Sequence, residues 1–356
     1  MRLPRSLLRA AWLPVAWFGL SACGAEPPAR EYPAALAQGV DPRGLENAYQ
    51  ALTGRSVTQA LLVERNGVLV MEEYFHGGSA ATYYDVRSVT KSVTSILIGI
   101  AVDQGRIGSL QQTIGDYLGP VVPDLEPSKA EITIEDLLTM TSGLPWNELN
   151  SDAQDYGAWV GSPDPLVWIL RRPFEREPGT YWHYNTGASH ILSAVLTRAT
   201  GTSAREFARQ HLFGPMGEEV GPWPADPRGY NYGGHGIGLT GRALIKTGRL
   251  FLDQGVYQGR RIVSADWVRE STATRWDTNT AVPWGTGYGY LWWTGSDSLT
   301  GLSFFLALGY GGQFVIDVPS KNTVIVATTT WSGVSNAGDN WYYVLRTIVE
   351  NILPSL

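Results

Sequence analysis

The chain has 356 residues, 44% of them hydrophobic and 17% charged, and this composition excludes general disorder because it can fill a large core. Its net charge is −6 and its basic residues form no long cluster, which leaves nucleic-acid binding without electrostatic support. The single cysteine, Cys23, excludes an intramolecular disulfide and a thiolate metal site.

The first residues have the layout of an export signal. Three arginines among the first nine residues precede an apolar stretch at Ala10–Leu20, which is too short to span a bilayer. We therefore expect residues 1–22 to be a signal peptide and the protein to be exported to the cell envelope or periplasm. The Ala- and Pro-rich residues 23–40 predict a tether.

The run Leu20-Ser21-Ala22-Cys23 resembles the bacterial lipobox, in which the signal is cut before a cysteine that becomes lipidated. The resemblance implies lipidation of Cys23, and two or more acyl chains would hold the protein stably on a membrane. The alternative is an ordinary signal peptide that is cut after Ala25, in which case Cys23 is discarded with it.

The first elements after the tether are a helix and a hairpin. A helix is expected over Asp41–Leu52, because Asp suits the N-cap and Pro the first helical position. Two β-type runs follow, Ser56–Glu64 and Val68–Phe75. Asn66-Gly67 lies between them, and this dipeptide between apolar runs is a strong hairpin signal.

The middle of the chain is predicted to be mostly helical. Val93–Val102 is apolar on nearly every side, which is typical of a helix buried in a protein core. Thr133–Asp136 has the pattern of a helix start, and that helix should end at Ser142-Gly143. Further helices are expected at Leu166–Arg171, Ala188–Ala199, Ala204–Leu212, Gly241–Asp253 and Ala265–Glu270.

The C-terminal part returns to β character before a closing amphipathic helix at Asp339–Ile352. An α+β fold is therefore predicted, with one antiparallel sheet built from residues 41–84 and 285–356 and flanked by helices. Residues 85–284 would form a mostly helical inserted domain. The β-type runs, each bounded by Gly or Pro, are Tyr288–Trp293, Ser303–Leu308, Phe314–Val318 and Thr323–Thr329.

Ser88 and Lys91 form the first S-x-x-K pattern of the mature chain. Three residues is close to one helical turn, so the lysine should lie beside the serine hydroxyl at the start of the buried helix. Serine needs a neighbouring base to become a nucleophile, and a lysine desolvated against apolar residues has a lowered pKa. The pair therefore predicts a nucleophilic serine. The alternative is a serine N-cap followed by a snorkelling lysine.

The segment that contains this pair, Tyr84-Asp85-Val86-Arg87-Ser88-Val89-Thr90-Lys91-Ser92, resembles the nucleophile segment of the serine β-lactamase and penicillin-binding-protein superfamily. The likeness is to its class C β-lactamase-related branch of esterases, D-peptidases and 6-aminohexanoate-dimer hydrolases. Residues 134–144, 230–236 and 308–313 match further motifs in the same order. The resemblance implies a β-lactamase/transpeptidase-like fold and cleavage of an ester or amide through a Ser88 acyl-enzyme.

The resemblance also implies a proton-carrying tyrosine in a Y-x-N pattern on a loop of the helical domain. Tyr184 occupies that place, with Tyr181 as its rival. The pattern differs here, because Asn185 follows the tyrosine directly and Thr186 stands where the family has asparagine. Either residue could bind a substrate carbonyl. A phenol needs a nearby cation to act as a base near neutrality, and Lys91 would provide it.

The third motif of the family's active site is Lys-Thr-Gly on a strand that faces the serine. The literal Lys246-Thr247-Gly248 lies in a stretch of helical periodicity, which removes it from consideration. Tyr310-Gly311-Gly312-Gln313 is the strand-bound equivalent, and its glycines allow a ligand to approach closely. The resemblance implies that its first three residues bind substrate and that backbone N–H groups of Gln313 and Ser88 form an oxyanion hole. The alternative is a simple Gly-rich turn.

Other chemistries fit this sequence less well. The histidines show no metal-ligand spacing, no G-x-S-x-G elbow supports a Ser-His-Asp triad, and His235 is expected to be structural. Hence no metal and no cofactor are expected, and the partner is a small ester or amide. Uncharged Tyr310 replaces the family's carboxylate-attracting lysine and favours neutral substrates. The alternatives are a true β-lactamase or D-Ala-D-Ala carboxypeptidase, and a non-catalytic envelope sensor.

Overall fold

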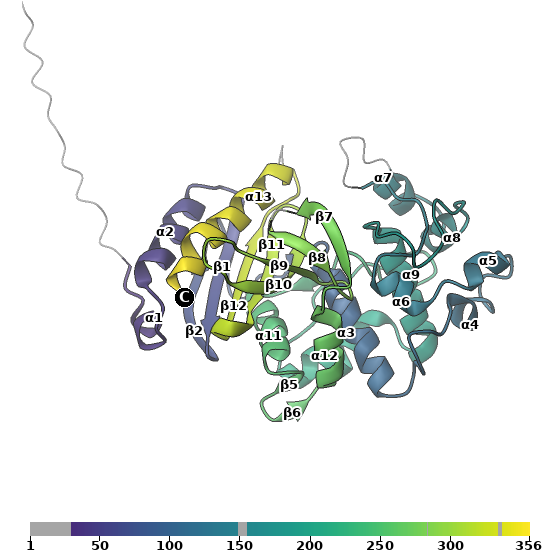
Figure 1. The fold of residues 1–356 in the computed structure, drawn as a ribbon, viewed down its shortest axis with the longest axis horizontal. Helices are drawn as coiled ribbons and strands as arrows, with labels where there is room; N and C mark the ends of the chain where they lie inside the picture. Colours follow the sequence, from purple (N-terminus) through teal and green to yellow (C-terminus); the bar gives the residue numbers. More distant parts are fainter. Residues whose placement is uncertain (1–29, 149–154, 283, 334–336) are drawn as a thin grey trace, which may run out of the picture. The chain divides into compact units, whose positions relative to one another are not determined.

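Strands from the two ends of the chain form one antiparallel sheet with the order β2-β1-β12-β11-β10-β9-β8-β7 (Figure 1). In this computed structural model the N-terminal hairpin consists of β1 (Thr58–Arg65) and β2 (Val68–Tyr74). Asn66 and Gly67 turn with positive φ, as the tight hairpin requires. β1 pairs with β12 (Thr323–Thr329), which joins the two chain ends. The predicted hairpin and α+β class are confirmed.

The C-terminal strands follow one another as a meander. β7 begins before residue 285, so the sheet includes a short stretch that was expected in the helical insert, while the division into domains stays a prediction. β11 and β12 are buried along their whole length, which shows that both faces of the sheet are covered. The meander consists of β7 (Trp276–Val282), β8 (Gly285–Tyr288), β9 (Trp293–Ser296), β10 (Ser303–Gly309), β11 (Gln313–Val318) and β12.

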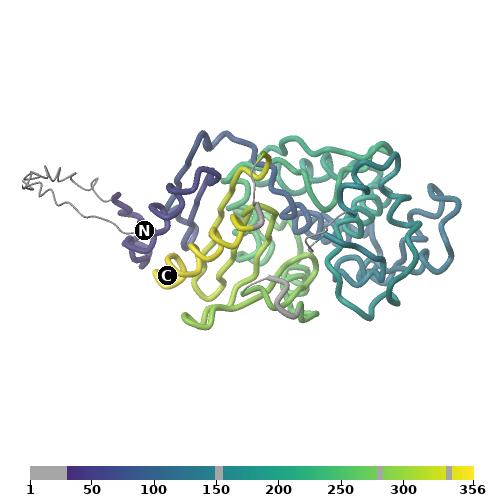
Figure 2. The backbone as a smooth tube through the Cα atoms, turned by 90° about the horizontal axis from the view of Figure 1, so that it is seen from above, coloured from purple at the N-terminus to yellow at the C-terminus, as the bar shows by residue number. Residues whose placement is uncertain are grey.

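Helices from both chain ends cover the sheet. α2 (Pro42–Thr53) and α13 (Ala337–Thr347) pack against each other, and the first and last described segments lie side by side in Figure 2. α11 (Gly241–Leu252) packs against β1, β11 and β12. The Asp41 side chain accepts a hydrogen bond from the Arg43 N–H at the start of α2, so the predicted N-cap is confirmed.

The structure describes residues 30–148, 155–282, 284–333 and 337–356. The predicted signal peptide, Cys23 and most of the tether lie outside these ranges. The last part of the tether is packed instead of extended, because α1 (Pro33–Ala37) contacts β2 and buries Ala35. Within the described ranges, no helix combines the length and the apolar character that a membrane span needs.

α3 (Val89–Asp103) is the buried centre of the fold. Every residue from Val89 to Ala101 is buried, and the helix contacts α9 (Thr186–Thr200), β10 and β11. The apolar pattern at Val93–Val102 is therefore confirmed as a core helix, although the helix begins earlier than the pattern indicates. Its N-terminus lies where the sheet meets the helical part of the chain, and Ser88 is its N-cap.

Short helices complete the part of the chain around α9. The predicted helix after Thr133 ends at Leu138, because Met140 adopts a positive φ that stops it before the expected glycine. Three short helices, α4, α5 and α7, were not predicted from the sequence, although α4 begins with a capping box. The set consists of α4 (Ile114–Leu118), α5 (Pro127–Ala130), α6 (Ile134–Leu138), α7 (Asp155–Val160), α8 (Pro165–Leu170), α10 (Ala204–Ala208) and α12 (Ala265–Thr272).

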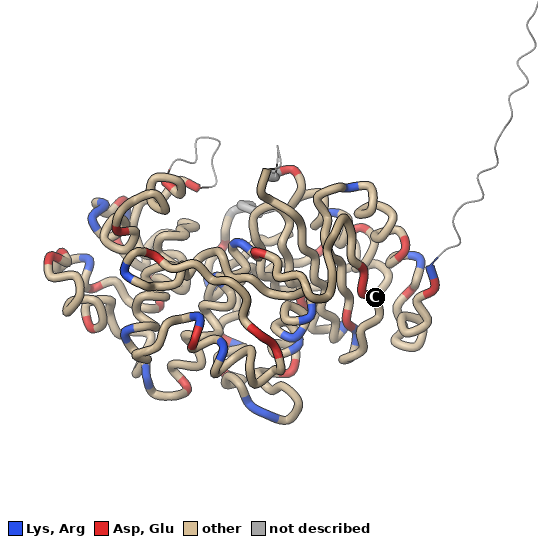
Figure 3. The backbone as a smooth tube through the Cα atoms, turned by 180° about the vertical axis from the view of Figure 1, so that it is seen from behind, with Lys and Arg blue, Asp and Glu red and all other residues tan. Residues whose placement is uncertain are grey.

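Three minor features complete the described fold. Basic and acidic residues are interspersed along the chain in Figure 3, in agreement with the absence of a basic cluster in the sequence. Two small two-stranded sheets pair β3 with β4 and β5 with β6. Their bounds are Tyr84–Asp85 with Gly238–Leu239, and Val256–Tyr257 with Arg260–Arg261. Short irregular helical turns lie at Arg209–Phe213, Gly214–Met216, Pro319–Lys321, Ile348–Ile352 and Leu353–Ser355.

Candidate active site

Ser88 caps α3 in an unusual way. An ordinary serine N-cap accepts a hydrogen bond from a backbone N–H in the first helical turn, but the Ser88 side chain makes no such bond. Its Oγ instead accepts a hydrogen bond from Lys91 Nζ at 3.0 Å. Its own backbone N–H has no acceptor among the described residues. The Ser88 hydroxyl is therefore hydrogen-bonded to Lys91 and does not cap the helix.

Lys91 is buried, with 1% of its surface exposed. Its Nζ also donates to Thr186 Oγ1 at 2.8 Å and to the Gly234 carbonyl oxygen at 3.0 Å. All three acceptors are uncharged, so no carboxylate is bonded directly to the buried ammonium. The pKa of Lys91 is lowered to about 8, mainly by burial; the Glu148 charge opposes this shift and the Arg87 charge adds to it. A neutral amine is therefore accessible near neutral pH.

Gly234 is a site residue to which the sequence pattern assigned no role. A Cβ added to it would lie 2.7 Å from Thr186 Cγ2 and 3.3 Å from Lys91 Nζ. A side chain here would therefore displace the lysine or its threonine partner. The signal in the sequence was the glycine pair that precedes His235, inside a stretch that matches the family. Only the folded chain shows that Gly234 supports Lys91.

Asn185 and Thr186 are buried and already bonded within the protein. Asn185 Oδ1 accepts from the Ala188 N–H at 2.9 Å, and its Nδ2 donates to the Leu144 carbonyl oxygen at 3.1 Å. Asn185 thus caps the helix whose first residue, Thr186, holds Lys91. The structure gives both residues a positioning role, and their contact with substrate stays a prediction.

Tyr184, and not Tyr181, lies against the Ser88–Lys91 pair. Its ring centroid is 4.7 Å from Lys91 Nζ and 5.7 Å from the ring of Trp293, whereas Tyr181 is 51% exposed. Burial raises the pKa of the Tyr184 phenol well above its usual value, although its hydrogen bond with Ser88 opposes the shift. The expectation that Lys91 makes this phenol a base is therefore reversed: Tyr184 stays protonated and is suited to donate a proton.

The end of β10 brings the glycine-rich turn to the nucleophile. A Cβ on Gly309 would collide with the carbonyl oxygen of Val86, so the strand lies directly against the segment that leads into Ser88. Gln313 opens β11 opposite Gly309, and its side-chain Nε2 donates to Thr329 Oγ1 at 2.8 Å. The Gln313 side chain is thus fixed inside the sheet, and its backbone N–H is the group to consider as an oxyanion donor.

The turn between β10 and β11 has a backbone that favours glycine. Gly311 and Gly312 have φ values of +85° and +113°, and a Cβ on Gly311 would lie 2.8 Å from that of Trp331. Tyr310 precedes them and is 50% exposed. The turn follows Gly309, which lies against the carbonyl oxygen of Val86, and substrate binding by the three residues stays a prediction.

Arg87 is a further residue of the site that the sequence pattern did not single out. It precedes Ser88 with a positive φ of 49°, a strained conformation for a non-glycine residue. Its Nη2 donates to Tyr156 Oη at 2.9 Å, and its guanidinium lies 4.2 Å from the Trp331 ring centroid. Arg87 therefore links the helical part to the end of the sheet, directly beside the nucleophile.

The Lys-Thr-Gly triplet and the histidines lie apart from the Ser88–Lys91 pair in role. Lys246-Thr247-Gly248 lies within α11, so its helical interpretation is confirmed. His190 Nε2 is 3.0 Å from Asp226 Oδ2, but its other ring nitrogen has no partner among the described residues, so no serine completes a triad. Burial lowers the pKa of His235 to about 2, which keeps this ring neutral. No group of metal-binding side chains occurs in the described ranges.

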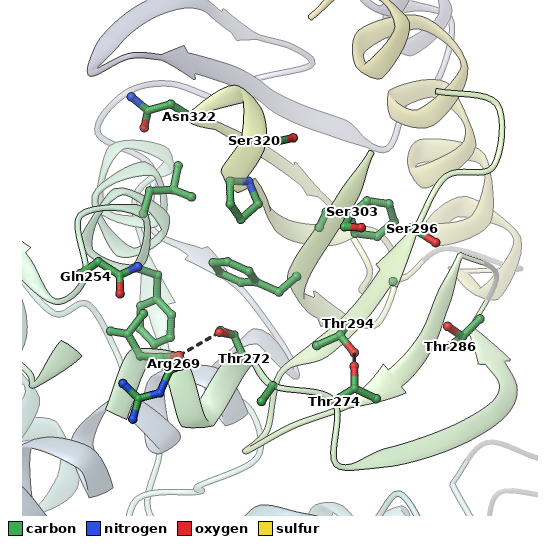
Figure 4. A pocket seen from close by; sticks show the side chains of 18 of the residues that line it. Gln254, Arg269, Thr272, Thr274, Thr286, Thr294, Ser296, Ser303, Ser320 and Asn322 are labelled. Atoms are coloured by element: carbon green, nitrogen blue, oxygen red, sulfur yellow. Dashed lines mark hydrogen bonds between the residues drawn. The ribbon is translucent and has the colours of Figure 1, made fainter. Parts of the chain in front are cut away.

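Two cavities differ in their relation to Ser88. A cavity of about 330 Å³ is lined by Tyr184 together with Trp146, Glu148 and Trp276. A larger one of about 1090 Å³, shown in Figure 4, is lined by residues of β9, β10 and α12, and none of the predicted site residues contributes to it. Two of its hydroxyls, on Thr274 and Thr294, bond to each other at 2.6 Å, and no lysine is among its lining residues. The smaller cavity is therefore the one that belongs to the site.

Solved structures show the same fold. A Bacillus anthracis protein assigned as a 6-aminohexanoate-dimer hydrolase superimposes with a TM-score of 0.71 at 22% identity, covering 85% of this chain and 81% of that one. The hydrolase EstCE1, described as having promiscuous acyltransferase activity, gives a TM-score of 0.68 at 17% identity, over 90% of this chain and 99% of its own. The β-lactamase/penicillin-binding-protein type of fold is therefore confirmed.

Sequence comparison leads to the same family. The 6-aminohexanoate-dimer hydrolase of Paenarthrobacter ureafaciens is 26% identical over 301 residues, which cover 77% of this chain and 73% of that protein. The profile of the Beta-lactamase family matches residues 43–347, which include every described residue of the candidate site. This chain therefore belongs to the Beta-lactamase family, and it is similar to a 6-aminohexanoate-dimer hydrolase and to the hydrolase EstCE1.

Proposed function

We propose that this protein is a serine hydrolase that cleaves ester or amide bonds through an acyl-enzyme on Ser88. The observation that carries the proposal is the 3.0 Å contact between Ser88 Oγ and Lys91 Nζ, in which the lysine has only uncharged partners. A binding protein has no need to bury an unpaired lysine against a serine at such cost. The alternative of a non-catalytic sensor is accordingly the weaker one.

In the proposed acylation, neutral Lys91 accepts the proton of Ser88 while Oγ attacks the substrate carbonyl carbon. The backbone N–H groups of Ser88 and Gln313 stabilise the oxyanion. Tyr184 donates its proton to the leaving oxygen or nitrogen as the substrate bond breaks, and the Lys91 ammonium then gives the phenolate the proton that it took from Ser88. No cofactor takes part.

Deacylation repeats these steps with water as the nucleophile. Water loses its proton to the Lys91 amine, its oxygen attacks the acyl carbon, and Ser88 Oγ leaves and takes that proton from the Lys91 ammonium. Tyr310 is uncharged and half exposed, so, if it lines the site as the resemblance implies, neutral esters and amides should be better substrates than nitrocefin or D-Ala-D-Ala peptides. A higher kcat/KM for nitrocefin than for p-nitrophenyl butyrate would favour the true β-lactamase instead.

The proposal is tested by covalent labelling of the purified protein. A fluorophosphonate should attach to Ser88 of the wild type, as located by peptide mass spectrometry, and Ser88→Ala should abolish both labelling and hydrolysis of p-nitrophenyl butyrate. Ser79→Ala, a change at an exposed serine, serves as the control and should leave both intact. Hydrolysis by Ser88→Ala at the wild-type rate would end this mechanism.

The proposed setting of this activity is the cell envelope, with the protein anchored through lipidated Cys23. The support is the lipobox-like run that ends at this cysteine. Mass spectrometry of the N-terminal peptide from membrane fractions should find acyl chains on Cys23. A soluble mature protein that begins after Ala25 would support an ordinary signal peptide.

A further inference from the structure

The cavity beside Tyr184 combines aromatic walls with negative charge. Its aromatic lining comes from three separate parts of the chain, namely the loop after α6, the loop before α9 and strand β7. Glu148 and Asp277 add carboxylates, and neither lysine nor arginine is among the lining residues that the structure describes. The aromatic residues are Trp146, Tyr181, Trp182, Tyr184 and Trp276.

Glu148 lies where its charge influences the catalytic groups. Its Oε2 accepts a hydrogen bond from Trp146 Nε1 at 2.7 Å, which holds the carboxylate at the cavity wall. The negative charge raises the pKa of Lys91 and of Tyr184, so its field reaches both ends of the proton path. His183 also lines the cavity, and its Nδ1 is 3.6 Å from Glu175.

We propose that this cavity binds the leaving-group end of the substrate and selects leaving groups that carry an ammonium. The assignment rests on the proposed function, in which Tyr184 protonates the leaving atom. Because Tyr184 itself lines the cavity, the atom that it protonates must stand at the cavity's edge. The remainder of the alcohol or amine then extends between the indole rings toward Glu148.

The physical basis is the preference of such a surface for cations. The faces of tryptophan and tyrosine rings attract ammonium groups, most strongly in tryptophan, and a carboxylate in a partly desolvated cavity adds an opposite charge. A leaving group with a carboxylate meets the same field with the wrong sign. We therefore expect the order cationic, neutral, anionic among leaving groups of equal size.

Matched esters separate charge from shape. Butyrylcholine and 3,3-dimethylbutyl butyrate have the same acyl chain and leaving groups of nearly equal volume, and only the first carries a positive charge. We expect wild-type kcat/KM for butyrylcholine to be about tenfold higher or more, as a cation–π contact with an added carboxylate allows. Glu148→Gln should reduce this ratio severalfold, mainly through KM.

The control variant is Glu175→Gln, which removes an acidic charge close to His183 but outside the cavity lining. It should keep the wild-type ratio between the two esters. A further substrate is a p-nitrophenyl ester whose acyl chain carries an ammonium group. Its kcat/KM should not exceed that of the p-nitrophenyl ester with the matching neutral acyl chain by a comparable factor. A gain with this ester alone would place the acyl group in the cavity and overturn the assignment.

Equal kcat/KM for the two butyrate esters in the wild type, or an unchanged ratio in Glu148→Gln, would overturn the inference. These outcomes differ from failure of the proposed function. In that case the wild type would hydrolyse neither ester nor p-nitrophenyl butyrate, and Ser88 would not be labelled. Activity on all three esters without a charge preference would leave the serine mechanism standing and remove only the cationic specificity.

Discussion

Two lysines of this chain each match a motif of the β-lactamase superfamily, but they lie in different environments. Lys91 belongs to an S-x-x-K pattern on α3, and Lys246 belongs to a K-T-G triplet on α11. Lys91 donates a hydrogen bond to the carbonyl oxygen of Gly234, and Lys246 donates one to the carbonyl oxygen of Met216. Lys246 also forms an ion pair with Glu218 at 2.6 Å, whereas the partners of Lys91 are uncharged.

The comparison indicates that a buried lysine can act as a base when no carboxylate is bonded to it. A carboxylate partner stabilises the ammonium form and keeps a lysine structural. Without one, complete burial lowers the pKa of Lys91 to about 8 and makes a free amine available next to Ser88. The motif alone does not specify how deeply its lysine is buried or which groups bond to it. Variants at the two sites test whether this difference in environment determines reactivity.

The largest effect is expected from replacing the two lysines in turn. Lys91→Met should lower the rate of Ser88 acylation by about 10⁴ or more, because catalytic groups that act as a unit fail together. Lys246→Met should leave that rate within about twofold and cost under about 1 kcal/mol of unfolding free energy, since its ion pair is partly exposed. Stopped-flow acylation and urea unfolding measure both. Equal losses of activity would remove the contrast.

The two tyrosines of the loop before α9 give the next largest difference. Tyr184→Phe should lower kcat for 3,3-dimethylbutyl butyrate, whose alkoxide leaving group needs a proton, by about 10²–10⁴, as the loss of a general acid does. Tyr181→Phe should cost less than about tenfold, because the exposed ring has no proton-transfer role. Steady-state kinetics with both variants decides the matter. A larger loss in Tyr181→Phe would mean that the wrong tyrosine is assigned.

A smaller effect is expected from crowding Lys91. Gly234→Ala places a methyl group against Thr186 and Lys91 Nζ, and a misplaced catalytic group of this kind costs about tenfold or more in kcat. The matched control is Gly157→Ala in α7, where an added Cβ meets nothing within 4 Å. A Gly234→Ala enzyme with wild-type kcat would show that the carbonyl oxygen of Gly234 does not need to hold the lysine closely.

Asp317, which lies against α11, is expected to make the free energy of unfolding depend on pH. Asp317 of β11 is fully buried and neither carboxyl oxygen has a hydrogen-bond partner among the described residues, so burial raises its pKa well above the usual value. The folded state then binds a proton that the unfolded state has lost, and stability falls as pH rises above about 4.

Asp317→Asn removes this titration, so its unfolding free energy relative to wild type should grow by up to about 1.4 kcal/mol per pH unit from pH 4 upward. Urea unfolding at several pH values measures the difference, and kcat should change little. A difference that is constant with pH would show that Asp317 is ionised in the folded protein.

Local patterns predicted the fold well wherever one segment carried the whole signal. The Asn66-Gly67 turn, the N-cap at Asp41 and the apolar α3 each follow from a few neighbouring residues, and all three are confirmed. The helix after Thr133 ends early because Met140 turns into a positive φ, a tertiary constraint that propensity does not contain.

The candidate site shows the same limit more sharply. Ser88, Lys91 and Tyr184 could be named because motif spacing and family resemblance mark them. Gly234 could not be given a role, because its contact with Lys91 joins residues that are 143 positions apart. The protonated state of Tyr184 could not be predicted from the sequence either, because it depends on complete burial of the phenol.

The central claim is that neutral Lys91 is the base for Ser88, and the pH dependence of acylation tests it most directly. Stopped-flow measurement of acylation by p-nitrophenyl butyrate should show a rate that rises about tenfold per pH unit and levels off above about pH 8, where the amine predominates. The Lys246→Met variant should show the same curve. A wild-type rate that is constant or falls between about pH 6 and pH 8 would contradict the account, because Lys91 would then not be the titrating base.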